Sequence, residues 1–348
     1  MSDKKALTIK ETFELAVKNH QEGKTDIAQE LYNQTLKINP SHSQALNNLG
    51  MIFQGLGENQ KAKECYGKAI EVDPNYSMAH NNLGGIFGAL GENQKAKECF
   101  EKSIKLNSNY AVAHNNLGVV FKELGENQKA KECYEKTIEV DPNYPIAHYN
   151  LAVVFKELRE NQKAKKCYEK SIELNPNYAD AHNNLGVVFK ELGENQKAKE
   201  CYEKAIELNP NYAVAHYNLG VLLYLLEENQ RAKECYEKAI EVDPNYAVAH
   251  NNLGVVFREL KENQKAKECF EKAIELNPNY ADAHKNLSIL LRQKRLLSKI
   301  EQAKKSEIKK TKISFFKKVH KKSYKSDLRL TSNPFISNRK VEAELISQ

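Results

Sequence analysis

A repeat of 34 residues runs through most of this chain of 348 residues and decides which folds are open to it. A small residue recurs with this period at Gly50, Gly84, Gly118, Ala152, Gly186, Gly220, Gly254 and Ser288. Nothing is inserted or deleted between residues 9 and 280, so the chain divides into eight equal units: 9–42, 43–76, 77–110, 111–144, 145–178, 179–212, 213–246 and 247–280. Stacked repeats bury their apolar faces only against their neighbours. The sequence therefore predicts one continuous array.

Each unit is predicted to form two helices. In the unit 111–144, apolar residues follow helical spacing as far as Leu124, and Gly125 suits the left-handed position that closes a helix. A second helix is expected from Gln128 to Val140, and Pro142 prevents its continuation. Neither helix is long or apolar enough to be stable alone. The two helices are therefore expected to depend on packing against neighbouring units.

Residue types at fixed places in the unit match a known pattern. Small residues stand at positions eight and twenty, aromatic residues at eleven and twenty-four, and proline at thirty-two. In the unit 111–144 these are Gly118, Ala130, Phe121, Tyr134 and Pro142. The pattern resembles the tetratricopeptide repeat (TPR) family and covers residues 9–280. The resemblance implies an all-α fold, a right-handed α-solenoid (TPR superhelix) whose first helices line an inner concave face.

The flanking segments complete the predicted organisation. Residues 1–8 are expected to form an N-terminal leader, residues 281–305 a C-terminal capping helix, and residues 306–348 a basic, flexible tail. Near the end of the chain, Ser337 and Asn338 could cap a helix that opens a further domain. Within the array, Arg159, Glu227 and Lys261 replace the turn glycine. Each replacement is expected to cost about 1 kcal/mol if its φ is positive.

Asparagine recurs at position six, which the family resemblance places on the concave face. The residues are Asn48, Asn82, Asn116, Asn150, Asn184, Asn218, Asn252 and Asn286. Asparagine is a mediocre helix former, so helix formation does not explain it. Its amide offers donors and an acceptor that match a peptide group. The ladder resembles the one inside the TPR region of O-linked N-acetylglucosamine transferases, which implies a grip on an extended protein segment. The alternative is that recently duplicated units carry a solvent-facing asparagine.

Position twelve adds cations to the predicted groove. They are Lys122, Lys156, Lys190 and Arg258, while Tyr224 stands at this position in the seventh unit. Position nine is mostly valine, so the groove suits an extended segment that carries some acidic residues. A second TPR binding mode uses lysine at position five and asparagine at position nine to grip a C-terminal carboxylate. Position five here is asparagine or tyrosine, so binding to chaperone tails is not expected.

The seven cysteines and seven of the ten histidines also follow the repeat. Packed helices lie roughly 8–10 Å apart, which is too far for a disulfide between equivalent cysteines. Unpaired cysteines indicate a reducing compartment, and the start of the chain has no apolar segment typical of a secretory signal. We therefore expect a cytoplasmic protein. The repeated histidines are expected to pack, because their spacing from cysteine does not match a metal site.

The end of the chain has a different charge. Residues 292–348 hold 17 Lys/Arg and 5 Asp/Glu, and eleven lysines lie between Lys299 and Lys325. Phe315 and Phe316 are interleaved with them. Three interpretations stay open: a solvated tail, binding to nucleic acid through phosphate contacts, or attachment to an anionic membrane surface.

No catalytic motif stands out, because every grouping of His, Cys and Asp recurs with the repeat. The sequence predicts no enzyme, no cofactor and no metal site. The favoured function is a protein–protein interaction scaffold that binds an extended polypeptide in the asparagine-lined groove. The alternative is the substrate-recognition array of a glycosyltransferase- or oxygenase-type enzyme whose catalytic domain is absent or acts in trans. The oligomeric state stays open.

Overall fold

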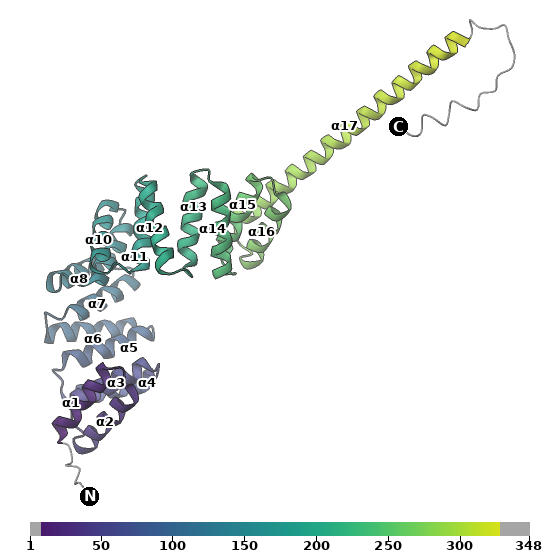
Figure 1. The fold of residues 1–348 in the computed structure, drawn as a ribbon. Helices are drawn as coiled ribbons and strands as arrows, with labels where there is room; N and C mark the ends of the chain where they lie inside the picture. The colour runs from purple at the N-terminus through teal and green to yellow at the C-terminus, as the bar shows by residue number, and fades with distance from the viewer. Residues whose placement is uncertain (1–7, 328–348) are drawn as a thin grey trace. The chain divides into compact units, whose positions relative to one another are not determined.

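The structure is a computed structural model that describes the backbone of residues 8–327 and the side chains of residues 8–318. These residues form 17 helices and no strand (Figure 1). The predicted helix near the C-terminus that Ser337 and Asn338 would cap lies outside the described residues.

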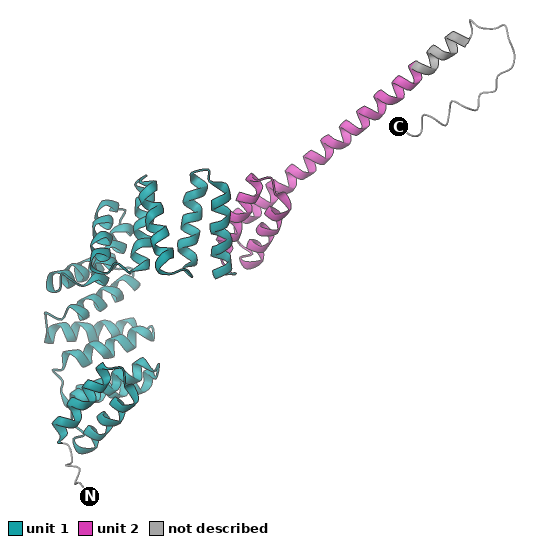
Figure 2. Cartoon of the chain, viewed as in Figure 1, with its two compact units in different colours: residues 1–244 teal, residues 245–348 magenta. Residues whose placement is uncertain are grey.

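The chain divides into two compact units, residues 1–244 and 245–348 (Figure 2). The sequence did not predict this division, which falls within the repeat 213–246, and the predicted domain bounds stay a prediction. The first unit contains α1 (Ile9–Gln21), α2 (Thr25–Ile38), α3 (Ser43–Gly55), α4 (Asn59–Val72), α5 (Ser77–Ala89), α6 (Asn93–Leu106), α7 (Ala111–Glu123), α8 (Asn127–Val140), α9 (Pro145–Glu157), α10 (Asn161–Leu174), α11 (Ala179–Glu191), α12 (Asn195–Leu208), α13 (Ala213–Leu225) and α14 (Asn229–Val242). The second contains α15 (Ala247–Glu259), α16 (Asn263–Leu276) and α17 (Ala281–Asp327).

Each repeat is a helix pair, as predicted, and its core is shared with the next repeat. In the pair α7–α8, Leu117 and Val120 are buried against Ala130 and Tyr134. Within each unit, the second helix of a pair also contacts the first helix of the following pair, for example α8 with α9 and α16 with α17. A helix of 13 or 14 residues gains little stability alone. The apolar contacts on both sides of each pair therefore hold the stack together.

The small residue at position eight sets the spacing of the two helices within a pair. A Cβ added to Gly118 would lie 2.6 Å from Cε1 of Tyr134, and at Gly84 it would lie 2.7 Å from Cε1 of Phe100. The aromatic ring of the second helix thus lies directly on the backbone of the first. The ring is almost completely buried in this position, since Tyr134 is 2% exposed.

The turns between the paired helices behave as the sequence predicts. Gly125 has a φ of 75°, in the left-handed region. The three replacements also adopt positive φ, with 60° at Arg159, 61° at Glu227 and 62° at Lys261. Each of these side chains therefore carries a backbone cost of about 1 kcal/mol relative to glycine, and the packing on both sides of the turn outweighs it.

The first helices of neighbouring repeats lie closer together than the second helices. Within residues 1–244, α3 contacts α5, α5 contacts α7, and α11 contacts α13. No two consecutive second helices in the described part of the chain make contacts of that extent. The first helices therefore lie on the inner side of the stack, which is where the family resemblance places the binding face.

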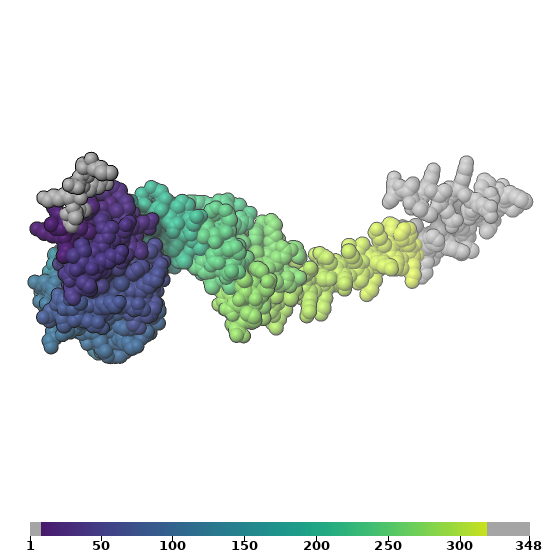
Figure 3. Space-filling model, turned by 90° about the horizontal axis from the view of Figure 1, so that it is seen from below, coloured from purple at the N-terminus to yellow at the C-terminus, as the bar shows by residue number. Residues whose placement is uncertain are grey.

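In the second unit, α17 does not end at residue 305, where the capping helix was predicted to give way to a flexible tail. It continues to Asp327. The reason lies in the sequence, since residues 281–327 contain no proline or glycine and are rich in lysine, which is a good helix former. All side chains from Arg292 to Lys318 are exposed, and in Figure 3 this stretch stands clear of α15 and α16.

All seven cysteines are free and half-buried, as the spacing argument expects. Each lies on a second helix, one residue before the buried aromatic residue. Burial raises the pKa of the Cys133 and Cys167 thiols to about 11. These thiols are therefore protonated at neutral pH and are poor nucleophiles, because the thiolate is the reactive form.

Two adjacent glycines in α5 provide a test of the close contact at position eight. Gly84→Ala should lower the free energy of unfolding by about 1–2 kcal/mol, because its Cβ meets the ring of Phe100 and Cβ of Cys99. Gly85→Ala meets nothing within 4 Å and should raise that free energy by about 0.5–1 kcal/mol, since alanine is the better helix residue. Urea unfolding followed by circular dichroism measures both. Equal effects of the two substitutions would contradict the packing argument.

Candidate functional site

One stripe of side chains runs along the inner side of each first helix. Positions two, six, nine and thirteen are four, three and four residues apart, so they lie on one helix face. In α7 these residues are Val112, Asn116, Val119 and Glu123. We call this set, repeated on α3 to α13 in the first unit, the inner stripe. It contains the predicted asparagines and is flanked by the cations of position twelve.

The eight predicted asparagines are all half-buried, and seven have described bonds that tie them to another helix. Within the first unit, the Nδ2 of each donates to position five of the preceding repeat. The bonds are Asn82 to Asn47 Oδ1 (3.0 Å), Asn116 to Asn81 Oδ1 (3.1 Å), Asn150 to Asn115 Oδ1 (3.0 Å), Asn184 to Tyr149 Oη (3.0 Å) and Asn218 to Asn183 Oδ1 (2.9 Å). In the second unit Asn286 donates to Asn251 Oδ1 (3.0 Å). Asn48, in the second repeat, has a different partner and donates to Tyr32 Oη (3.2 Å) on α2, because position five of the first repeat is Phe13.

The residue at position five completes the chain of hydrogen bonds. Asn81 Nδ2 donates to Oδ1 of its neighbour Asn82 at 3.2 Å, and the same bond joins Asn183 to Asn184 at 3.1 Å and Asn251 to Asn252 at 3.1 Å. Where a repeat has asparagine at both positions, the two side chains are therefore linked to each other and to the next repeat. We call positions five and six together the amide ladder.

Sequence reasoning missed the structural half of this ladder. Position five was considered only to exclude a carboxylate-binding site, yet Asn81, Asn115 and Asn183 are among the most buried polar residues of the described chain. The recurring Asn-Asn pair was the sequence signal for this role. Adjacent residues on a helix point in different directions, so both amides of a pair cannot lie on the same ligand-binding face. A buried side-chain amide needs partners, and here the next repeat supplies them.

The ladder leaves part of the position-six amide unused at Asn82, Asn116, Asn150 and Asn218. An asparagine amide has two N–H groups and an oxygen with two lone pairs. The bonds described above use one N–H and, where position five is asparagine, one lone pair. One N–H and one lone pair therefore remain on a half-buried side chain at the surface of the inner stripe. A peptide group has one C=O acceptor and one N–H donor, so it can hydrogen-bond to both of these remaining groups.

The predicted line of cations is largely neutralised by carboxylates of the same array. Lys122 Nζ lies 2.6 Å from Glu157 Oε1, and Lys156 Nζ lies 2.8 Å from Glu191 Oε1. In the second unit Arg258 pairs with Glu259 at 3.3 Å. The exception is Lys190, which has no ion pair in the described part of the first unit. Burial lowers the pKa of its amine.

A group of tyrosines replaces amides at one place on the inner side. The Tyr149 ring on α9 lies 4.9 Å from the Tyr178 ring and 5.7 Å from the Tyr168 ring, measured between centroids. Tyr212 Oη donates to Asp180 Oδ1 at 2.6 Å. Burial, together with Tyr149 and Asp180, raises the pKa of Tyr178 to about 12. The repeat-end tyrosines therefore act as uncharged wedges between repeats.

The repeated histidines hold the turns between repeats. Nε2 of His148 lies 3.0 Å from the carbonyl oxygen of Pro142, and the same contact joins His182 to Pro176 at 3.0 Å and His216 to Pro210 at 2.9 Å. Packing was predicted for these residues, and the structure adds a hydrogen bond to that role. No cluster of three or more His, Cys, Asp or Glu suited to a metal ion occurs among the described residues.

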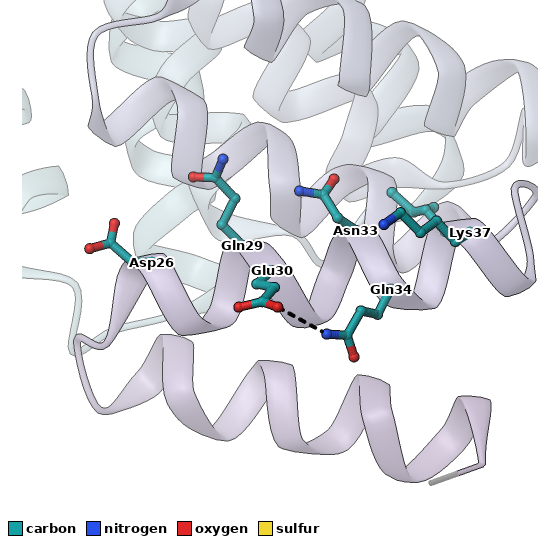
Figure 4. Close-up of a pocket in the computed structure, with 7 residues that line it drawn as sticks. Asp26, Gln29, Glu30, Asn33, Gln34 and Lys37 are labelled. Carbon is teal, nitrogen blue, oxygen red and sulfur yellow. Dashed lines mark hydrogen bonds between the residues drawn. The ribbon is translucent and has the colours of Figure 1, made fainter. Parts of the chain in front are cut away.

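A hollow on the outer side of the first unit lies along α2 (Figure 4). Its lining includes Asp26, Gln29, Asn33 and Lys37, and Gln34 Nε2 donates to Glu30 at 3.2 Å. The lining side chains all come from one helix and carry both charges. They form an ordinary solvated helix face.

No helix in the described residues is long and apolar enough to span a membrane.

The stacked helix pairs, the small residue under the aromatic ring and the inner stripe define a helical repeat protein that presents one long face. Family comparison identifies the repeat. The tetratricopeptide repeat model matches residues 43–76, 77–110, 111–144, 145–178, 179–212, 213–246 and 247–280, and a second tetratricopeptide repeat model matches residues 269–305. The chain belongs to the tetratricopeptide repeat family.

Solved structures share the fold. The APC/C hetero-tetramer Cut9–Hcn1 matches with a TM-score of 0.61 and 18% identity over 77% of this chain and 52% of that chain. PilF of Pseudomonas aeruginosa matches with a TM-score of 0.55 and 22% identity over 60% of this chain and 95% of that chain. YrrB, described as a TPR protein with an unusual peptide-binding site, has a TM-score of 0.46 and 26% identity over 54% of this chain and 96% of that one.

The family match and the likenesses to Cut9–Hcn1 and PilF confirm the predicted fold class, an all-α TPR superhelix of tandem helix pairs. The chain spans about half the length of the Cut9–Hcn1 chain that it matches. A search of the curated proteins finds no relative of this chain by sequence. The predicted likeness of the asparagine ladder to O-linked N-acetylglucosamine transferases stays a prediction.

The amide ladder can be tested with two substitutions at one position. Asn183→Leu removes the acceptor for Asn218 and the donor to Asn184, so the free energy of unfolding should fall by about 1–3 kcal/mol, the cost of unpaired buried polar groups. Asn183→Tyr should cost clearly less, because Tyr149 already serves as the acceptor at this position one repeat earlier. Chemical denaturation compares the two variants. If both substitutions cost the same, the ladder bonds do not stabilise the stack.

Proposed function

We propose that this protein is a non-enzymatic scaffold that binds an extended polypeptide along the inner stripe. The family consists generally of protein–protein interaction modules, and this chain carries seven matched repeats. The observation that carries the proposal is the unused half of the amide ladder. One N–H and one acceptor site recur on the inner side of each repeat, at the spacing of the stack, and they offer hydrogen bonds to a backbone of any sequence.

Apolar side chains border these amides. Ile146 and Val214 at position two are 43% and 41% exposed, and Val119 at position nine is 37% exposed. Exposed apolar groups on both sides of a polar row allow a bound segment to lose water while its backbone keeps its hydrogen bonds. This arrangement supports binding of an extended chain, because an extended backbone presents its polar groups regularly along its length.

The absence of catalysis is part of the proposal. The titratable groups of the repeats are held by the fold: histidines contact turn carbonyls, the thiols of the second helices are half-buried and protonated, and most of the position-twelve cations pair with glutamates. A substrate-recognition array that serves a glycosyltransferase or oxygenase in trans would use the same stripe in the same way. Free thiols at seven positions support a cytoplasmic compartment.

A second candidate function rests on α17. Between Lys299 and Lys318 this helix exposes lysines together with Ile308 (57% exposed), Phe315 (66%) and Phe316 (59%). A helix that combines cations with exposed aromatic side chains suits an anionic surface. The region 299–325 would therefore attach the array to an anionic membrane or a nucleic acid, while the repeats bind protein.

The peptide-binding proposal predicts that random peptides displayed on phage select extended binders on the full-length chain. Val187→Arg together with Val221→Arg places two charged side chains on the inner stripe and should weaken a selected peptide at least tenfold, measured by fluorescence anisotropy. The control variant Ile27→Arg with Val72→Arg adds the same charges on exposed apolar positions of second helices, which are 51% and 40% exposed. It should change the affinity less than twofold. Equal loss in both variants would exclude the inner stripe as the site.

For α17, we expect the full-length chain to sediment with vesicles that contain phosphatidylserine and not with neutral phosphatidylcholine vesicles. Phe315→Ser with Phe316→Ser should reduce the bound fraction several-fold, because the rings lose their apolar insertion. The outer-face pair Ile27→Ser with Val72→Ser should leave it unchanged. Binding to a single-stranded oligonucleotide that falls steeply with salt, without vesicle binding, would point to nucleic acid instead. No binding to either surface would reject this function.

A further inference from the structure

The seventh repeat departs from its neighbours at the end of its first helix. Positions twelve and thirteen are Lys-Glu in the fourth, fifth and sixth repeats and Arg-Glu in the eighth, but they are Tyr224 and Leu225 in the seventh. Both lie in the last turn of α13. The change removes two charged side chains from positions that form ion pairs between the preceding repeats.

The geometry of the earlier repeats shows what this change does. Lys122 pairs with Glu157 and Lys156 pairs with Glu191, each one repeat plus one residue further along. The same step from Lys190 leads to Leu225. The helices α11 and α13 that carry these two residues contact each other directly. At the place where the preceding repeats supply the carboxylate that pairs with the lysine, the seventh repeat therefore supplies a leucine to Lys190.

Lys190 is consequently a half-buried cation without an ion pair in the described part of the first unit. Taking a charge partly out of water without a partner is unfavourable. Burial is the largest cause of the lowered pKa of its amine; Glu191, which forms its ion pair with Lys156, acts to raise that pKa, and Lys156 acts to lower it. A carboxylate brought by a ligand would restore the interaction that the equivalent lysines make within the array.

Leu225 adds an apolar surface beside this cation. It is 63% exposed, which makes it the most exposed large apolar side chain described in the first unit. Leu226 follows it and is 40% exposed. Exposed leucine at the end of an inner helix, beside an unpaired cation, is suited to a ligand that combines a carboxylate with an aliphatic group.

We infer that Lys190 and Leu225 form an anchor subsite of the inner stripe for a peptide that carries Asp or Glu two residues away from Leu, Ile, Met or Phe. Side chains two apart in an extended chain point to the same side, so both can face the stripe. The carboxylate pairs with Lys190 Nζ, and the aliphatic side chain packs on Leu225. This inference rests on the proposed function and names the sequence that the scaffold prefers.

The decisive variant is Leu225→Glu, because it restores the residue that the fourth, fifth and sixth repeats have at this position. It should fold at least as stably as the natural chain, since it completes the Lys–Glu pattern. The matched control is Ile38→Glu, which places the same residue at a similarly exposed apolar position (57%) at the end of the second helix α2, outside the inner stripe. Lys190→Met removes the cation and keeps the length of the side chain.

Phage-displayed random decapeptides are selected on the full-length natural chain and on each variant. We expect the natural chain to enrich an acidic residue two positions from a large aliphatic or aromatic one. A selected peptide should lose at least tenfold in affinity with Leu225→Glu and with Lys190→Met, and less than twofold with Ile38→Glu. Replacing its acidic residue by the corresponding amide should cost as much as Lys190→Met, with no additional loss when the two changes are combined.

Three results would overturn the subsite. Peptides that lack the acidic–aliphatic pair would do so, as would unchanged affinity for Leu225→Glu. A shift from dimer to monomer in sedimentation with Leu225→Glu would show that a second copy of the chain occupies the patch. If peptides still depend on Val187 and Val221 but ignore Lys190 and Leu225, the subsite fails while the proposed function stands. If no peptide is selected at all, both fail.

Discussion

The close contact between position eight and the aromatic ring of the second helix is the constraint on which this structure depends. A ring that rests on a glycine, as Tyr134 does on Gly118, brings two short helices close enough to bury an otherwise marginal apolar face. The fifth repeat has Ala152 at this place, and both Ala152 and the facing Tyr168 are buried. Because each pair also packs on the next, the geometry of this contact passes from repeat to repeat and sets the direction of the inner stripe.

The amide ladder joins stability and binding in the same residues. Position five is buried and holds the neighbouring repeat, while position six keeps half of its hydrogen-bonding capacity at the surface. A substitution at position six therefore affects both the stack and the ligand, and the valines of position nine report on binding with less effect on the fold. From the sequence, the asparagines were interpreted as either peptide-binding residues or a by-product of duplication. Neither interpretation includes their third role, which is to connect one repeat to the next by hydrogen bonds.

Repetition also explains why the binding chemistry concentrates where the repeat is interrupted. In near-identical repeats, a cation at position twelve and a carboxylate at position thirteen satisfy each other along the array, as Lys122 and Glu157 do. Such pairs at a partly exposed surface contribute little to stability, and they leave little charge for a ligand. Leu225 replaces the glutamate of this pattern, so Lys190 has no ion-pair partner at that position. This one replacement gives the seventh repeat an exposed apolar side chain where the preceding repeats have a carboxylate.

Much of this protein follows from its sequence alone, because a period of 34 residues with a fixed small–aromatic pattern permits few structures. The helix pairs, the positive φ at Arg159, Glu227 and Lys261, and the free cysteines all follow from local chemistry and spacing. The tertiary structure decided what depends on neighbours in space: the partners of the asparagines, the pairing of Lys156 with Glu191, and the isolation of Lys190. It also extends α17 past residue 305, where charge suggested a flexible tail although nothing in the sequence breaks the helix. Backbone conformation is determined by nearby residues, whereas the availability of a polar group depends on side chains a whole repeat away, and only the stacked fold brings those together.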